Sequence, residues 1–369
     1  MKFRAERSEF TDAASWSLRT VGARATLPAL SGVRMEISGD ELILESTDLE
    51  ISSRLVLPVQ SEREGVALVP GRLLGDVVRN LPHAAVEAEM SDDRLHLECG
   101  RAKFDLRLMP AEDFPTMAAP SSDVTPATMK AEDFSRSISQ VARAASTDDH
   151  RPVLTGILLE STEAHLTLVA TDSYRLAVRT LPWELHTAVH ALVPRRALDE
   201  ARRVADHLGS DVQLALENAQ ATMTFPDRRL TTRLIEGKFI DYRQLLPESW
   251  ERRLRVNRRE LLQVVKRVAV VGEANSSATP VTLHITADAV QATAGNGELG
   301  EAEETLPGEL EGEPLEISFN PRYLTDGLEA IMDEEVMLDF RDPLKPAVIR
   351  PTDGDSEGEF LYLLMPVRL

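Results

Sequence analysis

The chain has 369 residues, of which 43% are hydrophobic and 28% charged, as in a soluble globular protein of two or three domains. Its formal net charge of −20 argues against nucleic-acid binding if that charge is spread evenly. The single cysteine, Cys99, excludes an internal disulfide, and no segment reads as a signal peptide or a membrane span. We therefore expect a cytoplasmic protein without membrane contact.

Helical patterns recur along the chain and fall into two classes. The first class covers residues 8–21, 131–145 and 257–271, and its equivalent residues Phe10, Phe134 and Leu261 are 124 and 127 residues apart. Helices of the second class open directly after Pro70, Pro194 and Pro321, because the missing proline N–H costs nothing just before the first helical turn. These prolines show the same two spacings, so two independent markers indicate one block repeated three times.

Strand patterns fill the remainder of each block. Thr47-Asp48 and Thr171-Asp172 follow apolar strands 124 residues apart, and linkers rich in proline or serine are expected at 115–126 and 247–253. The sequence thus predicts an α+β fold of three tandem domains at 1–120, 121–250 and 251–369. Each domain should pack two helices on antiparallel sheets.

Positive charge is concentrated on the predicted helices. In the helix from Gly71, we expect Leu73, Leu74, Val77, Val78 and Leu81 to face inward. Four helices carry, opposite their apolar face, a basic pair seven residues apart: Arg72 and Arg79, Arg136 and Arg143, Arg196 and Arg203, and Arg259 and Lys266. The last helix instead carries Asp326 and Glu329, and residues 301–316 hold seven glutamates and no base. The helices are therefore basic, and the strands and loops acidic.

Helix packing relates this charge pattern to duplex DNA. Six helices spaced about 10 Å apart around a channel would leave an opening of roughly 8 Å, whereas twelve would leave roughly 27 Å. The major groove alone is about 12 Å wide. If the repeats surround a duplex, two chains are needed, and their contacts would go to phosphates without sequence preference.

The chain resembles a known family, the bacterial sliding clamp, which is the beta subunit of DNA polymerase III holoenzyme. The resemblance covers the whole chain and is most specific at four stretches: residues 170–178 (ATDSYRLAV), 236–242 (EGKFIDY), 110–115 (PAEDFP) and the terminal 365–369 (MPVRL). It implies a head-to-tail homodimeric ring around DNA, with helices lining the channel. Such a ring is a processivity factor in DNA replication, cytoplasmic and nucleoid-associated, without catalytic activity or cofactor, that tethers the replicative polymerase.

The resemblance also implies three sets of site residues. Partners, including the polymerase and the clamp loader, would dock Gln-x-Leu-x-Phe-like peptides in a cleft formed by Leu154, Thr171, Ser173, Tyr174, Arg175, Leu176, Ile240, Gln244, Leu245, Asn320, Tyr323, Leu344, Pro346, Leu363, Leu364, Met365, Pro366, Val367, Arg368 and Leu369. DNA contacts would come from Arg24, Arg72, Arg151, Arg195 and Arg196, in addition to the helix pairs above. The dimer contact would set Phe104 against Val270 and Val271.

Several positions depart from the usual family pattern. The family often has Gly-His where this chain has Ser173-Tyr174, proline at Ile240, and an aromatic residue near Ala278. Asp148 and Asp149 are unusually acidic neighbours for Arg151. These changes should alter peptide preference at the cleft. From the residues alone, the apolar chain end would be interpreted as core.

Two other classes of function were weighed. An enzyme is disfavoured because no His-x-x-x-His pair, glycine-rich phosphate loop or Gly-x-Ser-x-Gly elbow occurs, and His150 and His207 are explained as exposed residues. A tandem-domain protein scaffold that does not encircle DNA is the alternative. It gives no reason for basic pairs at equivalent positions.

Overall fold

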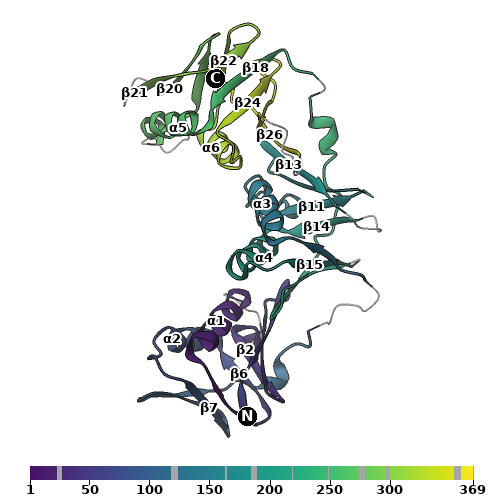
Figure 1. The fold of residues 1–369 in the computed structure, drawn as a ribbon, viewed down its shortest axis with the longest axis vertical. Helices are drawn as coiled ribbons and strands as arrows, with labels where there is room; N and C mark the ends of the chain where they lie inside the picture. Colours follow the sequence, from purple (N-terminus) through teal and green to yellow (C-terminus); the bar gives the residue numbers. More distant parts are fainter. Residues whose placement is uncertain are drawn as a thin grey trace. The chain divides into compact units, whose positions relative to one another are not determined.

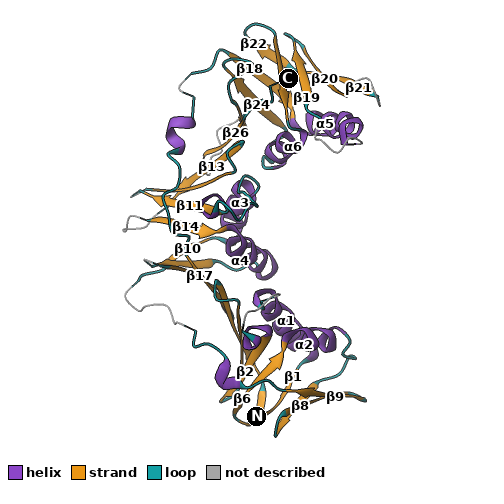
Figure 2. Ribbon diagram, turned by 180° about the vertical axis from the view of Figure 1, so that it is seen from behind, coloured by secondary structure: helices purple, strands orange, loops and turns teal. Residues whose placement is uncertain are grey.

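The structure is a computed structural model that describes the chain except residues 23–26, 118–123, 163, 184–188, 218, 248, 274–278, 296–299, 353–358 and 369, and describes only the backbone of 272 and 273. The chain forms two compact units (Figures 1 and 2). Unit 1 comprises residues 1–132 and 203–234, and unit 2 comprises residues 133–202 and 235–369.

Unit 1 contains two antiparallel sheets with strand orders β5-β1-β7-β8-β9 and β10-β15-β16-β17-β4-β3-β2-β6. Its elements are β1 (Lys2–Ala5), α1 (Arg7–Ser17), η1 (Leu18–Thr20), η2 (Pro28–Ser31), β2 (Gly32–Ser38), β3 (Glu41–Thr47), β4 (Ile51–Pro58), β5 (Gln60–Arg63), β6 (Gly65–Pro70), α2 (Gly71–Arg79), β7 (Val86–Ser91), β8 (Arg94–Cys99), β9 (Ala102–Arg107), η3 (Ala111–Asp113), β10 (Ala127–Met129), β15 (Val212–Leu216), β16 (Gln220–Thr224) and β17 (Arg228–Arg233).

Helices α1 and α2 lie next to each other in unit 1, and α1 packs on β3 and β4. In α2, Leu74, Val77 and Val78 are buried, as the apolar periodicity predicts. Leu73 is 42% exposed, so the expectation that it faces inward is wrong. At about 100° per residue it lies roughly 90° from the centre of the buried face, on the flank of the helix.

Unit 2 also contains two antiparallel sheets, with strand orders β14-β11-β12-β13-β26-β25-β24-β18-β22 and β21-β20-β19-β23. Its elements are α3 (Ala131–Ala142), η4 (Pro152–Leu154), β11 (Gly156–Ser161), β12 (His165–Thr171), β13 (Arg175–Pro182), β14 (His190–Pro194), η5 (Tyr242–Leu245), β18 (Arg252–Asn257), α5 (Arg258–Glu273), β19 (Val281–Ile285), β20 (Ala289–Gly295), β21 (Glu301–Pro307), β22 (Glu309–Glu311), β23 (Leu315–Phe319), α6 (Pro321–Glu329), β24 (Glu335–Phe340), β25 (Ala347–Pro351) and β26 (Glu359–Leu364). The helix α4 (Arg195–Leu208) begins in unit 2, and α3 takes its first two residues from unit 1.

The predicted repeat is visible in the order of the elements. Strands β3 and β4 recur 124 residues later as β12 and β13, and α2 and α4 begin 124 residues apart. Each repeat has a strand directly after its first hairpin, which is β4, β13 or β21 in the three repeats. Each repeat also ends on a last strand, which is β9, β17 or β26. Strand β4 pairs with β17, and β13 pairs with β26. This shared pairing explains why the middle third of the chain contributes to both compact units.

Candidate functional site

Exposed apolar side chains gather on unit 2 at the predicted peptide cleft. Of the eleven large hydrophobic residues that are exposed in the described structure, six belong to the predicted set: Tyr174, Ile240, Leu245, Leu344, Met365 and Val367. Exposed apolar residues scattered singly are ordinary, whereas a gathered set marks a binding surface.

The turn at 171–175 forms one edge of this surface. The Thr171 hydroxyl donates to the Arg175 carbonyl (2.6 Å) and accepts from the Ser173 N–H (3.1 Å). Asp172 Oδ1 accepts from the N–H groups of Tyr174 (2.9 Å) and Arg175 (3.1 Å). These bonds hold Ser173 at φ 82°, a conformation that favours glycine. The turn geometry therefore explains why the family often has glycine here.

Arg175 anchors the turn to α6 through charge. Its guanidinium pairs with Asp172 (3.0 Å) and with Asp326 of α6, although the side chain is only 7% exposed. It also donates to the Tyr362 hydroxyl (3.2 Å) and lies 4.4 Å from the ring centroid of Tyr323. Burial lowers the pKa of Arg175, but Tyr362 and Asp326 outweigh that effect and raise it, so the side chain stays charged.

Two aromatic rings extend the surface from the turn to α6. The rings of Tyr174 and Tyr323 stack with their centroids 6.1 Å apart. The Tyr362 hydroxyl donates to the Tyr323 carbonyl (2.9 Å), and burial raises the pKa of Tyr362. Gly327 lets α6 come this close, because a Cβ there would lie 2.6 Å from the Tyr362 ring. Small size, not backbone freedom, is what this position requires.

Asn320 has a structural role in addition to its predicted place in the cleft. Its side chain caps α6 by accepting hydrogen bonds from the N–H groups of Arg322 (3.0 Å) and Tyr323 (3.3 Å). A cap of this kind stabilises the first helical turn. Asn320 therefore fixes the start of the helix that carries Tyr323.

Residues 239–246 form a second edge of the surface. Phe239 and Tyr242 are buried in the same core cluster as Leu176 and Leu363, while Ile240 is 38% exposed. The Tyr242 hydroxyl donates to Glu160 (3.0 Å), and burial together with this carboxylate raises the pKa of Tyr242 to about 12. Gln244 donates to Asp241 (2.8 Å).

The end of the chain lies beside the 171–175 turn. Leu364 pairs with Arg175 on one side and with Ala347 on the other, which sets Met365 beside Pro346 and the exposed Leu344. The Met365 N–H donates to the Tyr174 carbonyl (2.9 Å), and the Val367 N–H donates to the Ser318 carbonyl (2.8 Å). Six predicted cleft residues are buried and support the surface from beneath: Leu154, Thr171, Arg175, Leu176, Leu363 and Leu364. Pro366 is half-buried and Arg368 exposed, while Leu369 lies outside the described residues.

A hollow of about 380 Å³ adjoins the tyrosine pair, within the range of about 300–1,000 Å³ that is usual for ligand sites. We call it the arginine hollow, and it is lined by Arg143, Ala145, Ser146, Thr147, Asp148, Arg151, Asp172, Tyr174, Arg175, Arg195, Arg322, Tyr323 and Asp326. Arg151 donates to the Ser173 hydroxyl (3.2 Å) and lies 3.8 Å from Asp148. Arg195 pairs with Asp199 (3.1 Å). Two predicted DNA contacts, Arg151 and Arg195, thus lie at the rim of the peptide surface.

The predicted basic helix faces are partly neutralised within unit 2. Arg143, the residue after α3, pairs with Asp326 (3.3 Å) and Glu329 (2.7 Å) of α6, and Lys266 of α5 pairs with Glu329 (2.6 Å). Hydrogen bonds from Lys266 and Arg143 hold the pKa of Glu329 below its usual range. Arg259 is exposed, and in the described part of the chain its guanidinium has no ion pair.

The other predicted DNA residues are divided between the units. In unit 1, Arg72, Arg79 and Arg203 are exposed, and Arg79 pairs with Asp76. In unit 2, Arg196 is exposed and Arg136 is half-buried. Arg24 lies outside the described residues. The structure therefore places three of the four basic pairs on helices, sets Arg143 just beyond the end of α3, and joins Arg143 and Lys266 to the acids of the last helix.

The predicted dimer residues flank two open sheet edges. Phe104 is half-buried on β9, which pairs with β8 alone among the described strands. Val270 is 63% exposed on α5, and Val271 lies close to the start of β21, because a Cβ at Gly300 would be 3.3 Å from its side chain. Strand β21 likewise pairs only with β20 in the described structure.

Three positions that organise the surface were not predicted from the sequence. Asp326 contacts Arg143 and Arg175, and Tyr362 contacts Tyr323. Gly327 leaves room for the ring of Tyr362, so all three act on residues more than 30 positions away. Only the apolar run of β26 (FLYLL) would have singled out Tyr362, and then as core. The acidic character of α6 was visible, but its partners were not.

Neither a metal-binding cluster nor a membrane-spanning helix occurs among the described residues. No three histidine, cysteine, aspartate or glutamate side chains there are arranged to hold a metal ion. His150 contacts Asp148 (2.8 Å) and His207 lies 3.6 Å from Asp12, both as exposed side chains. None of the described helices is both long and apolar enough to cross a membrane.

Comparison with known proteins identifies the family. Profiles of the DNA polymerase III beta subunit match along the chain, with the N-terminal domain at residues 1–118, the central domain at 128–241 and the C-terminal domain at 243–368. The beta sliding clamp of Streptomyces coelicolor is 36% identical, with 100% of both chains covered. The three tandem domains of the predicted fold are therefore confirmed, while their limits at 120 and 250 stay a prediction.

Solved structures agree with this assignment. The DNA polymerase sliding clamp of Bacillus subtilis superposes with a TM-score of 0.94 at 26% identity, covering 100% of this chain and 99% of that one. The sliding clamp of Pseudomonas aeruginosa bound to griselimycin gives a TM-score of 0.92 at 29% identity, with 100% of both chains covered. Family profiles, relatives and fold lead to one conclusion: the chain belongs to the family of DNA polymerase III beta subunits.

Proposed function

We propose that two copies of this chain close head to tail into a ring around duplex DNA and act as a sliding clamp for a DNA polymerase. The observation that carries the proposal is the pairing rule of the repeat. Strand β4 pairs with β17, and β13 pairs with β26. The equivalent strands β21 and β9 have no such partner in the described part of the chain and each form the edge of a sheet. An open strand edge is a template for pairing with another chain. Pairing β21 of one copy with β9 of the next repeats the same junction, and two such junctions close a ring.

Charge on the two open edges supports this pairing. Strand β9 and the residue before it carry Arg101, Lys103 and Arg107 against one acid, Asp105. Strand β21 carries Glu301, Glu303 and Glu304 and no base. Opposite charges across an interface speed association and fix its register. The two edges therefore attract each other and repel a copy of themselves, which favours a head-to-tail dimer.

The helix faces supply the proposed contact with DNA. Arginines on helix surfaces of both units suit phosphate contacts that carry no sequence information. Because α6 neutralises Arg143 and Lys266, the unpaired Arg259 should contribute more to DNA affinity than either of them. A loosely fitting basic channel permits sliding, and no catalytic step belongs to this role. The protein would act in the cytoplasm, at the nucleoid during replication.

The apolar surface of unit 2 supplies the proposed tether. A Gln-x-Leu-x-Phe-like peptide would bury its leucine and aromatic side chains among Tyr174, Ile240, Met365 and Val367, which are all exposed in the chain. The arginine hollow beside this surface would favour partner segments with acidic residues next to the motif. The polymerase and the clamp loader are the expected partners.

Molar mass in solution tests the dimer. We expect the chain to sediment at twice its own mass. In the double variant Lys103→Glu/Arg107→Glu, the dissociation constant of the dimer should rise at least tenfold. Adding Glu301→Lys/Glu303→Lys to that variant should restore the dimer, because attraction between the edges returns with reversed sign. A monomeric parent chain, or a variant with all four substitutions that does not recover the dimer, would refute pairing through β9 and β21.

A further inference from the structure

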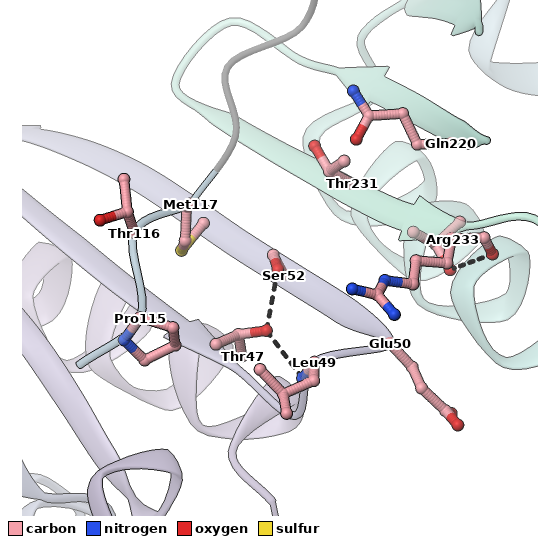
Figure 3. Close-up of a pocket in the computed structure, with 11 residues that line it drawn as sticks. Thr47, Leu49, Glu50, Ser52, Pro115, Thr116, Met117, Gln220, Thr231 and Arg233 are labelled. Carbon is pink, nitrogen blue, oxygen red and sulfur yellow. Dashed lines mark hydrogen bonds between the residues drawn. The ribbon is translucent and has the colours of Figure 1, made fainter. Parts of the chain in front are cut away.

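Unit 1 contains a hollow that the proposed function does not use. It has a volume of about 210 Å³ and lies between β4, β16, β17 and the segment that follows Phe114 (Figure 3). Its lining residues are Thr47, Leu49, Glu50, Ser52, Pro115, Thr116, Met117, Gln220, Thr231, Thr232 and Arg233. We call it the unit 1 hollow. It is smaller than a usual small-molecule site of about 300–1,000 Å³, so it suits one or two side chains of a bound segment.

The wall of this hollow repeats the turn of the peptide surface, bond for bond. In the 47–51 turn, the Thr47 hydroxyl donates to the Ile51 carbonyl (3.1 Å) and accepts from the Leu49 N–H (3.0 Å). Asp48 Oδ1 accepts from the N–H groups of Glu50 (3.0 Å) and Ile51 (2.8 Å). The same four bonds form the 171–175 turn, 124 residues later.

The backbone of the two turns matches as well. Leu49 adopts φ 77° and Ser173 adopts φ 82°. A leucine in the left-handed conformation is strained and persists only where the surroundings enforce it. The strained residue is also 43% exposed and faces the hollow. The strained backbone thus occurs at a residue whose apolar side chain lines the hollow.

The strand beside each turn is equivalent too. In unit 2, Leu364 pairs with Arg175 and the Met365 N–H donates to the Tyr174 carbonyl (2.9 Å). In unit 1, Thr232 pairs with Ile51 and the Arg233 N–H donates to the Glu50 carbonyl (3.0 Å). Arg233 therefore stands where the peptide surface has Met365. The unit 1 hollow is the internal copy of the frame that holds the proposed cleft.

The side chains of this copy differ in chemistry. Thr232 and Arg233 replace Leu364 and Met365, and the hydroxyls of Thr47 and Ser52 are hydrogen-bonded to each other (2.8 Å). Figure 3 shows the Arg233 guanidinium pointing toward the middle of the hollow and the Glu50 carboxylate pointing away. In the described structure the Arg233 guanidinium makes no ion pair or hydrogen bond. The apolar contribution comes from Leu49, Pro115 and Met117.

We infer that the unit 1 hollow is a second peptide-docking site, which takes a short extended acidic segment of a partner protein. A carboxylate of that segment pairs with Arg233, and a neighbouring aliphatic side chain packs on Leu49 and Met117. The polar lining rejects the aromatic, apolar peptide of the unit 2 surface, so the two sites select different segments. The inference rests on the proposed function in one respect, that the equivalent frame in unit 2 binds peptides.

The test measures binding of a fluorescein-labelled capped peptide, Gly-Leu-Asp-Leu-Glu-Gly, to the full chain by fluorescence anisotropy. An excess of unlabelled Gln-Leu-Ser-Leu-Phe peptide blocks the unit 2 surface throughout. We expect saturable binding that weakens at least tenfold in Arg233→Glu, changes less than threefold in Arg233→Lys, and disappears in Thr116→Trp, which fills the hollow. The matched control Arg94→Glu alters an exposed arginine of unit 1 outside the hollow and should leave binding unchanged.

Each opposite result overturns the inference. Absence of binding with the unit 2 surface blocked would place the acidic peptide in that surface. Equal affinity in Arg233→Glu and the parent chain would remove the proposed ion pair, and equal binding of a peptide with lysines at the acidic positions would reduce the contact to non-specific adhesion. Failure of the blocking peptide to bind by calorimetry would count against the proposed cleft alone, because the effects of the Arg233 and Thr116 variants are each measured relative to the parent chain.

Discussion

Replacing Arg175 with methionine removes the charge that joins the 171–175 turn to α6 while preserving much of the side-chain volume. The guanidinium is 7% exposed and pairs with Asp172 and Asp326, whose side chains are 12% and 20% exposed. Methionine leaves both carboxylates without this partner and leaves the ring of Tyr323 without its cation. The variant should therefore weaken both the fold of unit 2 and the peptide surface.

The size of the effect follows from burial. Removing one partner of a fully buried ion pair costs about 3–5 kcal/mol, because the other charge remains buried without compensation. Here both carboxylates keep some contact with water, and Asp326 retains Arg143 at 3.3 Å. We therefore expect the lower end of that range, about 3 kcal/mol. With a urea dependence of about 3 kcal/mol per molar, the unfolding midpoint of unit 2 should fall by about 1 M.

Tryptophan fluorescence can report on unit 2 separately. Trp183 and Trp250 belong to unit 2 and Trp16 to unit 1, so a Trp16→Phe background leaves only the tryptophans of unit 2. Urea unfolding of Arg175→Met in this background should show the shift, and affinity for a Gln-x-Leu-x-Phe peptide should fall at least tenfold. A change in the free energy of unfolding below about 1 kcal/mol would refute the view that Arg175 holds the turn to α6.

Three further predictions concern the same surfaces. Asn320→Ala should lower the free energy of unfolding in urea by about 1 kcal/mol, because it removes the cap of α6. Asn320→Asp should retain most of that stability, and an equal loss in both variants would argue against capping. Because the pKa of Tyr242 is raised to about 12, its stabilising effect is complete below pH about 10 and is lost as pH rises toward 12. Burial also raises the pKa of Tyr362, so tyrosinate absorbance should show a late step that Tyr242→Phe reduces by one tyrosine, and an unchanged late step would contradict the Glu160 contact. Arg259→Ala should lower the salt dependence of DNA binding by about one phosphate contact and Lys266→Ala by less, since Lys266 already pairs with Glu329; equal slopes would contradict this difference.

Much of the fold could be predicted from the sequence, because the repeat shows in local sequence patterns. The proline at the start of each second-class helix and the Thr-Asp turns that end β3 and β12 are fixed by local backbone chemistry, so their spacing survives from sequence to structure. Leu73 shows the limit of periodicity, because a residue on the flank of an apolar face can point either way. The ends of the helices were also approximate, since α3 ends at Ala142 and not at Ala145.

The candidate site was less accessible, because contacts between distant segments create it. Leu363 and Leu364 are core residues, as the apolar chain end suggested without the family, yet Met365 and Val367 beside them are exposed. Arg143 looked like an unpaired surface charge, and its partners Asp326 and Glu329 lie more than 180 positions away. No local pattern contains such a pairing. The resemblance to the family supplied the cleft residues, and the structure supplied the reasons for their positions.

Topological linkage to DNA is the central claim, and its most direct measurement is the rate at which the loaded protein leaves circular and linear duplexes of equal length. A closed ring can slide off a free end but not off a circle, so it should remain on circular DNA and leave linear DNA rapidly, and blocking the ends should abolish the difference. Equal rates of release from circular, linear and end-blocked DNA would contradict encirclement and favour a scaffold that never surrounds the duplex.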